Sequence, residues 1–340
     1  MTDVPPLEPD VWRQLAAHYP NLEGVRRAQR APTGNDSCTW ILFGSGRTRR
    51  VILRQYREAV KEQRIRFEHA ILSHLRKQDF PCPDPLPACT GATFVRVGRR
   101  HYCLFGYCEG TKLAKPVLRW LRGRWVAQTG EMLADYHIRM RDFRWDGEMP
   151  GAAEDHEWAA RELTRYRKEL EGRASEDSFA REVLRRMGPV QECLSEVRRF
   201  FETDRRDYSP VVIHGDFGPS NVLYGGGKIV GVLDFLAARA AQRVVDLAYG
   251  LAGFSKWRDS SLHRGLGQRF LRGYQGRHPL PSGELETLPY WMMLNQLKRL
   301  RWILVQFYER GNPRAPAWFS DNYGLLLWIR DHPSEIAALG

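Results

Sequence analysis

Short runs of β-forming residues alternate with amphipathic segments over the first hundred residues. Residues 8–19 are predicted to form a short helix. Two β-rich runs follow, Cys38–Phe43 and Val51–Tyr56, and the glycines between them predict a hairpin. Residues 59–77 carry apolar side chains at helical spacing, and residues 95–107 return to strand character. This part of the chain is therefore predicted to be a small β-rich unit.

Farther along the chain, the spacing of apolar residues becomes helical. Those between residues 118 and 136 fall on one face of a helix. Residues 155–171 are predicted to form a charged amphipathic helix, and residues 189–203 a second one that begins at its proline. A β-rich island at 210–235 interrupts the helices. The second part of the chain is thus predicted to be mainly helical.

Together the two patterns predict an α+β chain of two lobes. A β-rich lobe spans 1–108 and a larger helical lobe spans 109–340, with a hinge at about 104–110. The chain of 340 residues is 43% hydrophobic, which provides for a sizeable core and excludes a wholly disordered chain. We expect two lobes of one domain.

Composition narrows the class of protein without deciding it. The chain has 52 Lys and Arg against 40 Asp and Glu, a net charge of +12, which raises nucleic acid or an anionic ligand as a partner. The arginines are scattered, so a solvated surface is the simpler interpretation. No apolar run suits a membrane span, and the N-terminus lacks the pattern of a secretory signal. The six cysteines show no C-x-x-C spacing. We expect a cytoplasmic protein without a zinc site.

The β-rich island carries the residues that suggest chemistry. An apolar strand leads into His214-Gly215-Asp216, four residues then precede Asn221, and a glycine hairpin leads to a strand that ends at Asp234. Phosphoryl transfer needs a carboxylate that accepts the proton of the attacking hydroxyl, and oxygen ligands for Mg²⁺. Asp216 suits the first role, while Asn221 and Asp234 suit the second. The alternative is that both aspartates merely cap turns.

The same spacing occurs in the protein-kinase catalytic loop, H-R-D-x-x-x-x-N, with an Asp-Phe metal site downstream. A protein kinase is nevertheless the weaker interpretation. Gly218 stands where those enzymes carry a lysine, Leu236 follows Asp234-Phe235 in place of a glycine, and the chain has no G-x-G-x-x-G loop.

The chain resembles the aminoglycoside phosphotransferase/choline kinase superfamily, whose members share the His-Gly-Asp-x₄-Asn and Asp-Phe motifs. The resemblance also covers the segments that end at His137 and begin at Val245. It implies a protein-kinase-like bilobal fold with a small β-rich N-lobe and a larger helical C-lobe. It further implies that Asp216 is the catalytic base, that Asn221 and Asp234 bind Mg²⁺, and that ATP or GTP is the co-substrate. Asp246 would buttress the loop, and His214 and His137 would be structural.

By the same resemblance the N-lobe holds the nucleotide. The segment with Gly34, Asn35 and Ser37 lies where the family places its phosphate-covering loop, although an ordinary turn is the alternative. Arg54 takes the place of the kinase lysine, as in choline kinases, with Glu68 as its partner; the alternative is a surface arginine. The hinge, with Phe105 and Tyr107, would offer backbone groups to the nucleobase.

These observations predict a small-molecule O-phosphotransferase whose partners are a nucleoside triphosphate and a hydroxyl-bearing acceptor. Residues 261–340 contain ten Lys or Arg against six Asp or Glu, so a homoserine-like amino alcohol is favoured over a polycationic aminoglycoside. An antibiotic-resistance kinase is one alternative. A nucleotide-binding pseudokinase and a nucleic-acid binder are alternatives of another class. We expect no nucleic-acid or membrane partner, and a monomer or homodimer.

Overall fold

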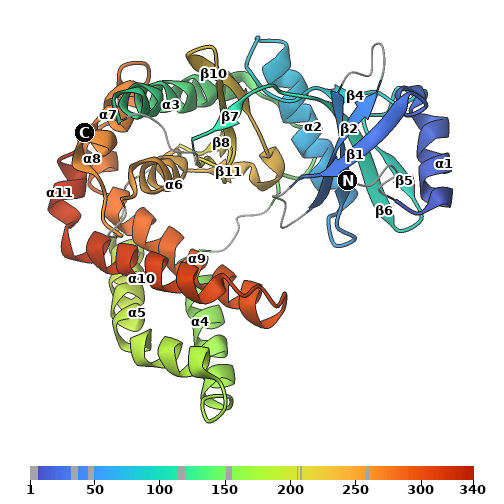
Figure 1. The fold of residues 1–340 in the computed structure, drawn as a ribbon. Helices are drawn as coiled ribbons and strands as arrows, with labels where there is room; N and C mark the ends of the chain where they lie inside the picture. The colour runs from blue at the N-terminus through green and yellow to red at the C-terminus, as the bar shows by residue number, and fades with distance from the viewer. Residues whose placement is uncertain are drawn as a thin grey trace. The chain divides into compact units, whose positions relative to one another are not determined.

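The computed structural model describes residues 7–31, 37–44, 50–113, 119–150, 155–204, 206, 209–257 and 260–340. The chain falls into two compact units (Figure 1). Unit 1 comprises residues 1–112, 142–150 and 221–237, and unit 2 comprises residues 113–141, 151–220 and 238–340. The β-hairpin at 221–237 thus belongs to the same unit as the N-terminal sheet. The predicted α+β fold with a β-rich and a helical lobe is confirmed.

Unit 1 contains a six-stranded antiparallel sheet. Five of its strands follow the order β1-β2-β3-β6-β4, and β5 also pairs with β6. The predicted hairpin over 38–56 is confirmed as β2 and β3. The predicted strand over 95–107 is instead a hairpin, because Gly98 adopts φ +60° and turns the chain. The strands are β1 (Val25–Arg30), β2 (Ser37–Gly44), β3 (Arg50–Tyr56), β4 (Pro85–Leu86), β5 (Val95–Val97) and β6 (Arg100–Gly106).

The sheet of unit 1 uses its two faces differently. Helix α1 (Pro9–His18) contributes Leu15 to a core with Leu42, Leu53 and Leu104, which come from three adjacent strands. Side chains alternate between the faces of a strand, so Arg54 and Tyr56 of β3 point away from this core. Helix α2 (Glu62–Arg76) carries the partners of these two residues. The predicted helix over 59–77 is confirmed.

A second, three-stranded sheet completes unit 1. It has the order β10-β9-β7, from β7 (Thr111–Lys112), β9 (Val222–Gly225) and β10 (Lys228–Val232). Gly226 and Gly227 have φ of +56° and +78°, which glycine adopts without the steric cost that a side chain brings. These glycines allow the tight turn that pairs β9 with β10.

In its described residues, unit 2 is mainly helical and contains the pair of strands β8 (Val211–Ile213) and β11 (Arg239–Ala241). Helices α3 and α7 approach closely: a Cβ atom on Gly130 would lie 2.0 Å from the backbone oxygen of Phe270. The helices are α3 (Arg119–Arg139), α4 (His156–Glu171), α5 (Ser178–Thr203), α6 (Val244–Ser255), α7 (Arg264–Gln275), α8 (Ser282–Leu285), α9 (Leu288–Tyr308), α10 (Ala315–Asp331) and α11 (Pro333–Ala337).

One predicted boundary in unit 2 is wrong. The helix expected to begin at Pro189 is α5, which begins at Ser178 and contains the proline in its interior. The carboxylate of Asp177 caps its N-terminus by accepting hydrogen bonds from the amides of Phe179 and Ala180 at 2.8 and 3.0 Å. The cap and the apolar face of the helix outweigh the cost of the interior proline.

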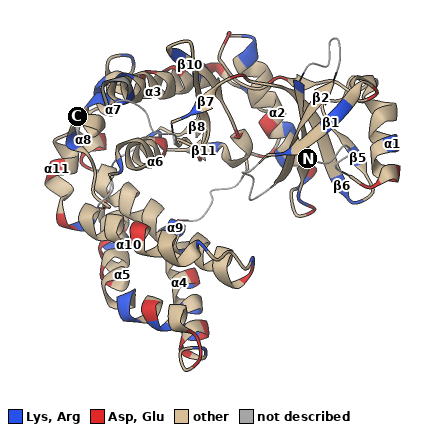
Figure 2. Ribbon diagram, viewed as in Figure 1, with Lys and Arg blue, Asp and Glu red and all other residues tan. Residues whose placement is uncertain are grey.

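Charge is distributed over both units in a mixed pattern, with basic and acidic positions interleaved along the same helices (Figure 2). On α4, Arg165 contacts Glu169 at 2.6 Å and Arg167 contacts Glu171 at 2.9 Å, both at the spacing of one helical turn. Several arginines are therefore accounted for by local ion pairs. Every helix in the described part of the chain is too short or too polar to cross a lipid bilayer.

Candidate active site

In unit 2, hydrogen bonds to one buried carboxylate fix the loop that follows β8. Asp246, near the start of α6, accepts hydrogen bonds from the backbone amides of His214 at 2.7 Å and Gly215 at 2.8 Å. The Asp246 side chain is fully buried. Gly215 has φ +79°, a conformation that a residue with a side chain would adopt only under strain. The turn that presents Asp216 is thus fixed by its backbone.

Two further side chains hold the carboxylate itself. His137 of α3 contacts Asp246 through Nε2 at 3.2 Å, and its Nδ1 lies 2.9 Å from the hydroxyl of Tyr274 on α7. Burial raises the pKa of Asp246, but its hydrogen bonds to His137 and to the His214 amide outweigh burial and leave that pKa below its ordinary value. Asp246 is therefore a carboxylate at neutral pH.

Asp216 occupies the position that this anchored loop presents. It follows β8 by three residues, is half-buried, and donates its backbone amide to Nδ1 of His214 at 3.2 Å. His214 itself is fully buried. A carboxylate on a rigid loop at the end of a strand suits a group that must meet a substrate hydroxyl in a fixed geometry.

Asn221 and Asp234 lie at the same end of the β9–β10 hairpin in unit 1. Val222 pairs with Val232, and the amide of Leu233 donates to the carbonyl of Asn221 at 2.8 Å. Asp234 follows directly, with φ +67°, and its side chain is 45% exposed. The hairpin register therefore brings the two predicted metal ligands to neighbouring positions.

The chemistry of this pair fits Mg²⁺, which takes oxygen ligands and commonly uses one or two from protein plus phosphate oxygens. Asn221 offers an amide oxygen and Asp234 a carboxylate. Among the described residues, no group of three or more His, Cys, Asp or Glu side chains gathers as a metal site.

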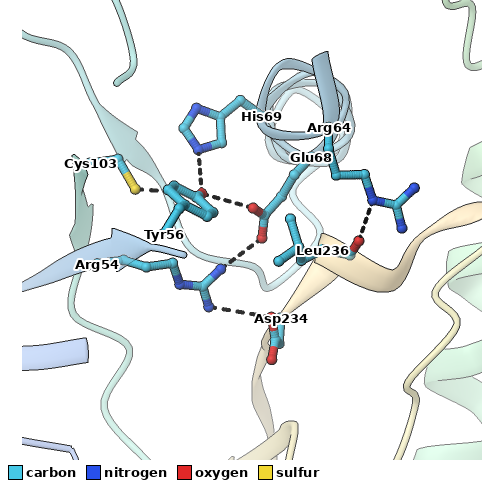
Figure 3. Close-up of polar contacts among 8 residues, drawn as sticks. All are labelled: Arg54, Tyr56, Arg64, Glu68, His69, Cys103, Asp234 and Leu236. Carbon is cyan, nitrogen blue, oxygen red and sulfur yellow. Dashed lines mark hydrogen bonds and ion pairs between the residues drawn. The ribbon is translucent and has the colours of Figure 1, made fainter. Parts of the chain in front are cut away.

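Arg54 links this hairpin to the N-terminal sheet within unit 1 (Figure 3). One of its terminal nitrogens donates to Glu68 at 2.8 Å and the other to Asp234 at 3.5 Å. The Arg54 side chain is 14% exposed and that of Glu68 2%. Burial lowers the pKa of Arg54, and the two carboxylates more than compensate, so its guanidinium stays charged. Burial raises the pKa of the Glu68 carboxyl, an effect that Arg54 opposes.

Three other residues that were predicted to bind the nucleotide lie on or next to strands of the N-terminal sheet. Ser37 begins β2 and pairs with Tyr56 of β3. Phe105 is buried on β6, and its ring centre lies 5.3 Å from the Arg54 guanidinium. Tyr107 follows β6, and its ring lies 4.9 Å from the guanidinium of Arg50. Gly34 and Asn35 lie outside the described residues.

The sequence did not reveal the polar contacts that Tyr56 and His69 make next to Glu68. The hydroxyl of Tyr56 donates to Glu68 at 2.8 Å and lies 3.1 Å from Nε2 of His69 (Figure 3). Arg64 also donates to the carbonyl of Leu236 at 2.6 Å, which ties α2 to the chain just after Asp234. Tyr56 follows Arg54 at the two-residue period of a strand, a signal that places both on one face.

The comparison that decides the family is a match over residues 28–280 to the model of the phosphotransferase enzyme family, APH. The chain belongs to this phosphotransferase family. The match includes the loop of Asp216 and the hairpin of Asn221 and Asp234. The predicted resemblance to the aminoglycoside phosphotransferase superfamily is thereby confirmed, and the protein is a phosphotransferase with a hydroxyl acceptor.

Relatives and solved structures agree with this assignment. The phosphotransferase is 27% identical over 281 residues to a homoserine kinase of Rhizobium rhizogenes, covering 83% of this chain and 78% of the relative. It is 26% identical over 318 residues to a homoserine kinase of Mesorhizobium japonicum, covering 94% and 88%. Its fold matches a microcompartment-associated aminopropanol kinase with a TM-score of 0.73 at 18% identity, covering 97% and 99% of the two chains.

Proposed function

We propose that this phosphotransferase uses Mg²⁺ and ATP or GTP to phosphorylate the hydroxyl of homoserine or of a closely similar amino alcohol. The observation that carries the proposal is the similarity over most of their length to proteins named homoserine kinase. The aminopropanol kinase of the same fold is likewise named for an amino alcohol. The basic balance of residues 261–340 supports an acceptor with a carboxylate.

In the proposed mechanism, Asp216 orients the acceptor hydroxyl and accepts its proton as the oxygen attacks the γ-phosphorus. A bond forms between that oxygen and phosphorus, and the bond from phosphorus to the β-phosphate oxygen breaks, which releases the nucleoside diphosphate. Asn221 and Asp234 would hold Mg²⁺, which when bound neutralises phosphate charge. His214 and Asp246 keep the loop of Asp216 in place.

Unit 1 supplies the proposed nucleotide contacts. Arg54 would neutralise phosphate oxygens through the same planar fork that now contacts two carboxylates, and Glu68 would orient it. Backbone groups near Phe105 and Tyr107 would meet the nucleobase, and the segment with Gly34, Asn35 and Ser37 would cover the phosphates. We place the enzyme in the cytoplasm, as a monomer or homodimer without a nucleic-acid partner.

A coupled assay of nucleoside diphosphate release tests the acceptor. Homoserine, aminopropanol, spectinomycin and other aminoglycosides would each be tried with ATP and with GTP. We expect the highest kcat/KM on homoserine. A higher value on an aminoglycoside would support the resistance-kinase alternative, and nucleotide binding without transfer to any acceptor would support the pseudokinase.

The variant Asp216→Asn tests the assigned base. We expect loss of transfer by about a thousandfold or more, because the acceptor hydroxyl would lose both its orientation and its proton acceptor. Binding of Mg-ATP should stay within about twofold, because Asp216 acts on the acceptor. Asp331→Asn, at an exposed ion pair with Arg330 on α10, is the matched control and should retain full activity. An active Asp216→Asn enzyme would refute the assignment.

A further inference from the structure

A continuous chain of buried polar groups runs behind the Arg54–Glu68 ion pair, entirely within unit 1 (Figure 3). The hydroxyl of Tyr56 donates to Oε2 of Glu68 at 2.8 Å, and Nε2 of His69 lies 3.1 Å from the Tyr56 hydroxyl. On its other side, Nδ1 of His69 lies 2.7 Å from Oγ1 of Thr93. Tyr56 is fully buried and His69 is 5% exposed. Such groups are costly to bury unless each finds its partner.

The direction of each hydrogen bond in this chain follows from chemistry. Burial keeps the pKa of Tyr56 well above its ordinary value, so its proton remains available to Glu68. The Tyr56 oxygen must then accept, and it lies within reach of Nε2 of His69 and of the Cys103 thiol at 3.6 Å. Burial lowers the pKa of His69 to about 3, so its ring is neutral and carries one proton. That proton is on Nε2, and the bare Nδ1 accepts from Thr93.

This arrangement holds Glu68 independently of Arg54. Oε1 of Glu68 faces the guanidinium, whereas Oε2 faces Tyr56, so the carboxylate keeps one partner when Arg54 turns toward another anion. Tyr56 lies two residues after Arg54 on β3, and His69 follows Glu68 on α2. Two adjacent side-chain contacts therefore join the strand to the helix, and both involve the groups that orient Arg54.

We propose that Tyr56 and His69 are positioning residues, which fix Glu68 so that Arg54 is aimed at the phosphates of the nucleotide. The proposal rests on the proposed function, because it assigns Arg54 a phosphate as its ligand. Neither residue touches the reacting atoms. Their effect passes through Glu68 to Arg54, and the quantity that they control is nucleotide affinity.

The first test compares two tyrosines of unit 1. Tyr56→Phe removes the hydroxyl that holds Glu68. Tyr102→Phe removes an equally buried hydroxyl, which accepts from Gln55 at 2.7 Å on the opposite face of the sheet. Tyr102→Phe removes the hydrogen bond from Gln55, whereas Tyr56→Phe removes the hydrogen bond to Glu68 and the contacts of the same oxygen with His69 and Cys103. We expect the melting temperature to fall in both variants, and farther in Tyr56→Phe. Calorimetric titration with Mg-ATP should show about tenfold weaker binding for Tyr56→Phe and less than twofold for Tyr102→Phe. Equal effects, or an unchanged Tyr56→Phe, would overturn the proposal.

The second test concerns the proton on His69. His69→Gln places an amide nitrogen where Nε2 now donates, and should bind Mg-ATP within about threefold of the unaltered protein. His69→Leu keeps a buried side chain of similar size without a donor, and should weaken binding about as much as Tyr56→Phe. If both variants weaken binding alike, the shape of the ring matters rather than its donor, and the chain through His69 is wrong.

A third test asks whether Tyr56 acts through Arg54. Adding Tyr56→Phe to Arg54→Met should cause no further loss of Mg-ATP affinity, because the side chain to be aimed is gone. A full additive loss would show a separate role for Tyr56 and contradict the proposal. Because binding is measured without acceptor, a protein that binds Mg-ATP but ignores homoserine would refute only the proposed acceptor. A protein that binds no nucleotide would refute both the function and this inference.

Discussion

Each unit of the chain buries an acidic side chain next to its candidate site residues, and the two are held by different kinds of partner. Asp246 in unit 2 accepts from two backbone amides and contacts His137. Glu68 in unit 1 accepts from the side chains of Arg54 and Tyr56. The pKa of Asp246 is lowered, whereas that of Glu68 is raised, although both are buried. Burial raises the pKa of both carboxyls. At Asp246 the interactions with His137 and His214 outweigh burial, whereas at Glu68 the nearby Asp234 carboxylate adds to burial and the donors Arg54 and Tyr56 do not outweigh them.

The comparison separates two tasks. Backbone amides cannot move without moving the chain, so Asp246 fixes the path of the loop that carries Asp216. Side-chain donors can turn, so Glu68 stabilises a guanidinium that can still change partner. A rigid anchor suits Asp216 if it accepts a proton as proposed, and an adjustable one suits Arg54 if it binds a polyphosphate as proposed.

We expect the largest effect from a change at Asp246, the carboxylate bonded to backbone amides, which we call the rigid anchor. Asp246→Asn would turn an amide donor toward one of the two backbone amides, so that a buried N–H loses its acceptor. We expect a loss of about 3–5 kcal/mol in the free energy of unfolding, because three hydrogen bonds to a buried charged group are weakened or lost and a buried N–H is left without an acceptor. We also expect kcat to fall about a hundredfold as the Asp216 loop shifts. Urea unfolding and steady-state kinetics would measure both.

Asp135→Asn is the control for this variant. Asp135 lies on α3 in the same unit and forms a half-exposed ion pair with Arg139 at 2.8 Å. Its loss should cost less than about 1 kcal/mol. If Asp246→Asn behaves like this control, then Asp246 does not anchor the loop.

A change at Glu68, the carboxylate bonded to side chains, which we call the adjustable anchor, should have a smaller effect. Glu68→Gln leaves the buried Arg54 guanidinium with Asp234 as a charged partner at 3.5 Å. We expect a loss of about 2–3 kcal/mol in unfolding free energy, less than a complete break of a buried pair. The KM for nucleotide should rise about tenfold with little change in the KM for acceptor. Glu62→Gln, at an exposed pair with Arg66 on the same helix, should change neither value.

An equal rise in both KM values for Glu68→Gln would count against its role in nucleotide binding. It would indicate a general loss of structure in unit 1.

The sequence was sufficient to predict the fold class and the chemistry-bearing motif, because both depend on local spacing. The hairpin over 38–56 and the helix over 59–77 follow from residue periodicity, and the family match confirms the phosphotransferase assignment. Strand β1 was missed because Val25–Arg30 is mostly polar, and it becomes a strand by pairing with β2 at the edge of the sheet. Tertiary pairing, not propensity, forms it.

The supporting groups could not be predicted, because they depend on contacts between distant segments. Nothing in the spacing of Tyr56 and Glu68 reveals a hydrogen bond, since it depends on how β3 meets α2. Tyr274 reaches His137 only because Gly130 and Gly273 let α3 and α7 approach closely. The assignments of Asp216, Asn221 and Asp234 themselves stay predictions until the variants are measured.

The variant Arg54→Lys tests whether Arg54 acts through its positive charge alone, because it keeps the charge and removes the planar guanidinium. Arginine now contacts two carboxylates through two nitrogens, whereas a lysine ammonium is a single point charge. We expect about tenfold weaker binding of Mg-ATP, measured by calorimetry. Arg50→Lys, on the same strand at an exposed contact with Glu109, should bind normally. Unchanged affinity in Arg54→Lys would show that charge alone suffices at this position.

The smallest effect is a difference in pH dependence between the two carboxylates. The pKa of Asp246 is below the ordinary 3.8, so its contribution to stability is present above pH 3.8 and is lost as the pH falls through the folded-state value. The pKa of Glu68 is above the ordinary 4.5, so the folded state retains its proton longer, and stability falls as the pH rises from 4.5 through the folded-state value. The two slopes have opposite signs.

Denaturation curves measured between pH 2.5 and 7 would reveal these slopes by difference. The unfolding free energy of the unaltered protein minus that of Asp246→Asn should rise with increasing pH below 3.8. The unfolding free energy of the unaltered protein minus that of Glu68→Gln should fall as the pH rises above 4.5. Each unit of pKa shift corresponds to about 1.4 kcal/mol, so the amplitudes are measurable. Slopes of the same sign would mean that Arg54 and Tyr56 stabilise the Glu68 carboxylate as effectively as His137 and the His214 amide stabilise that of Asp246, and the distinction between a rigid and an adjustable anchor would then fail.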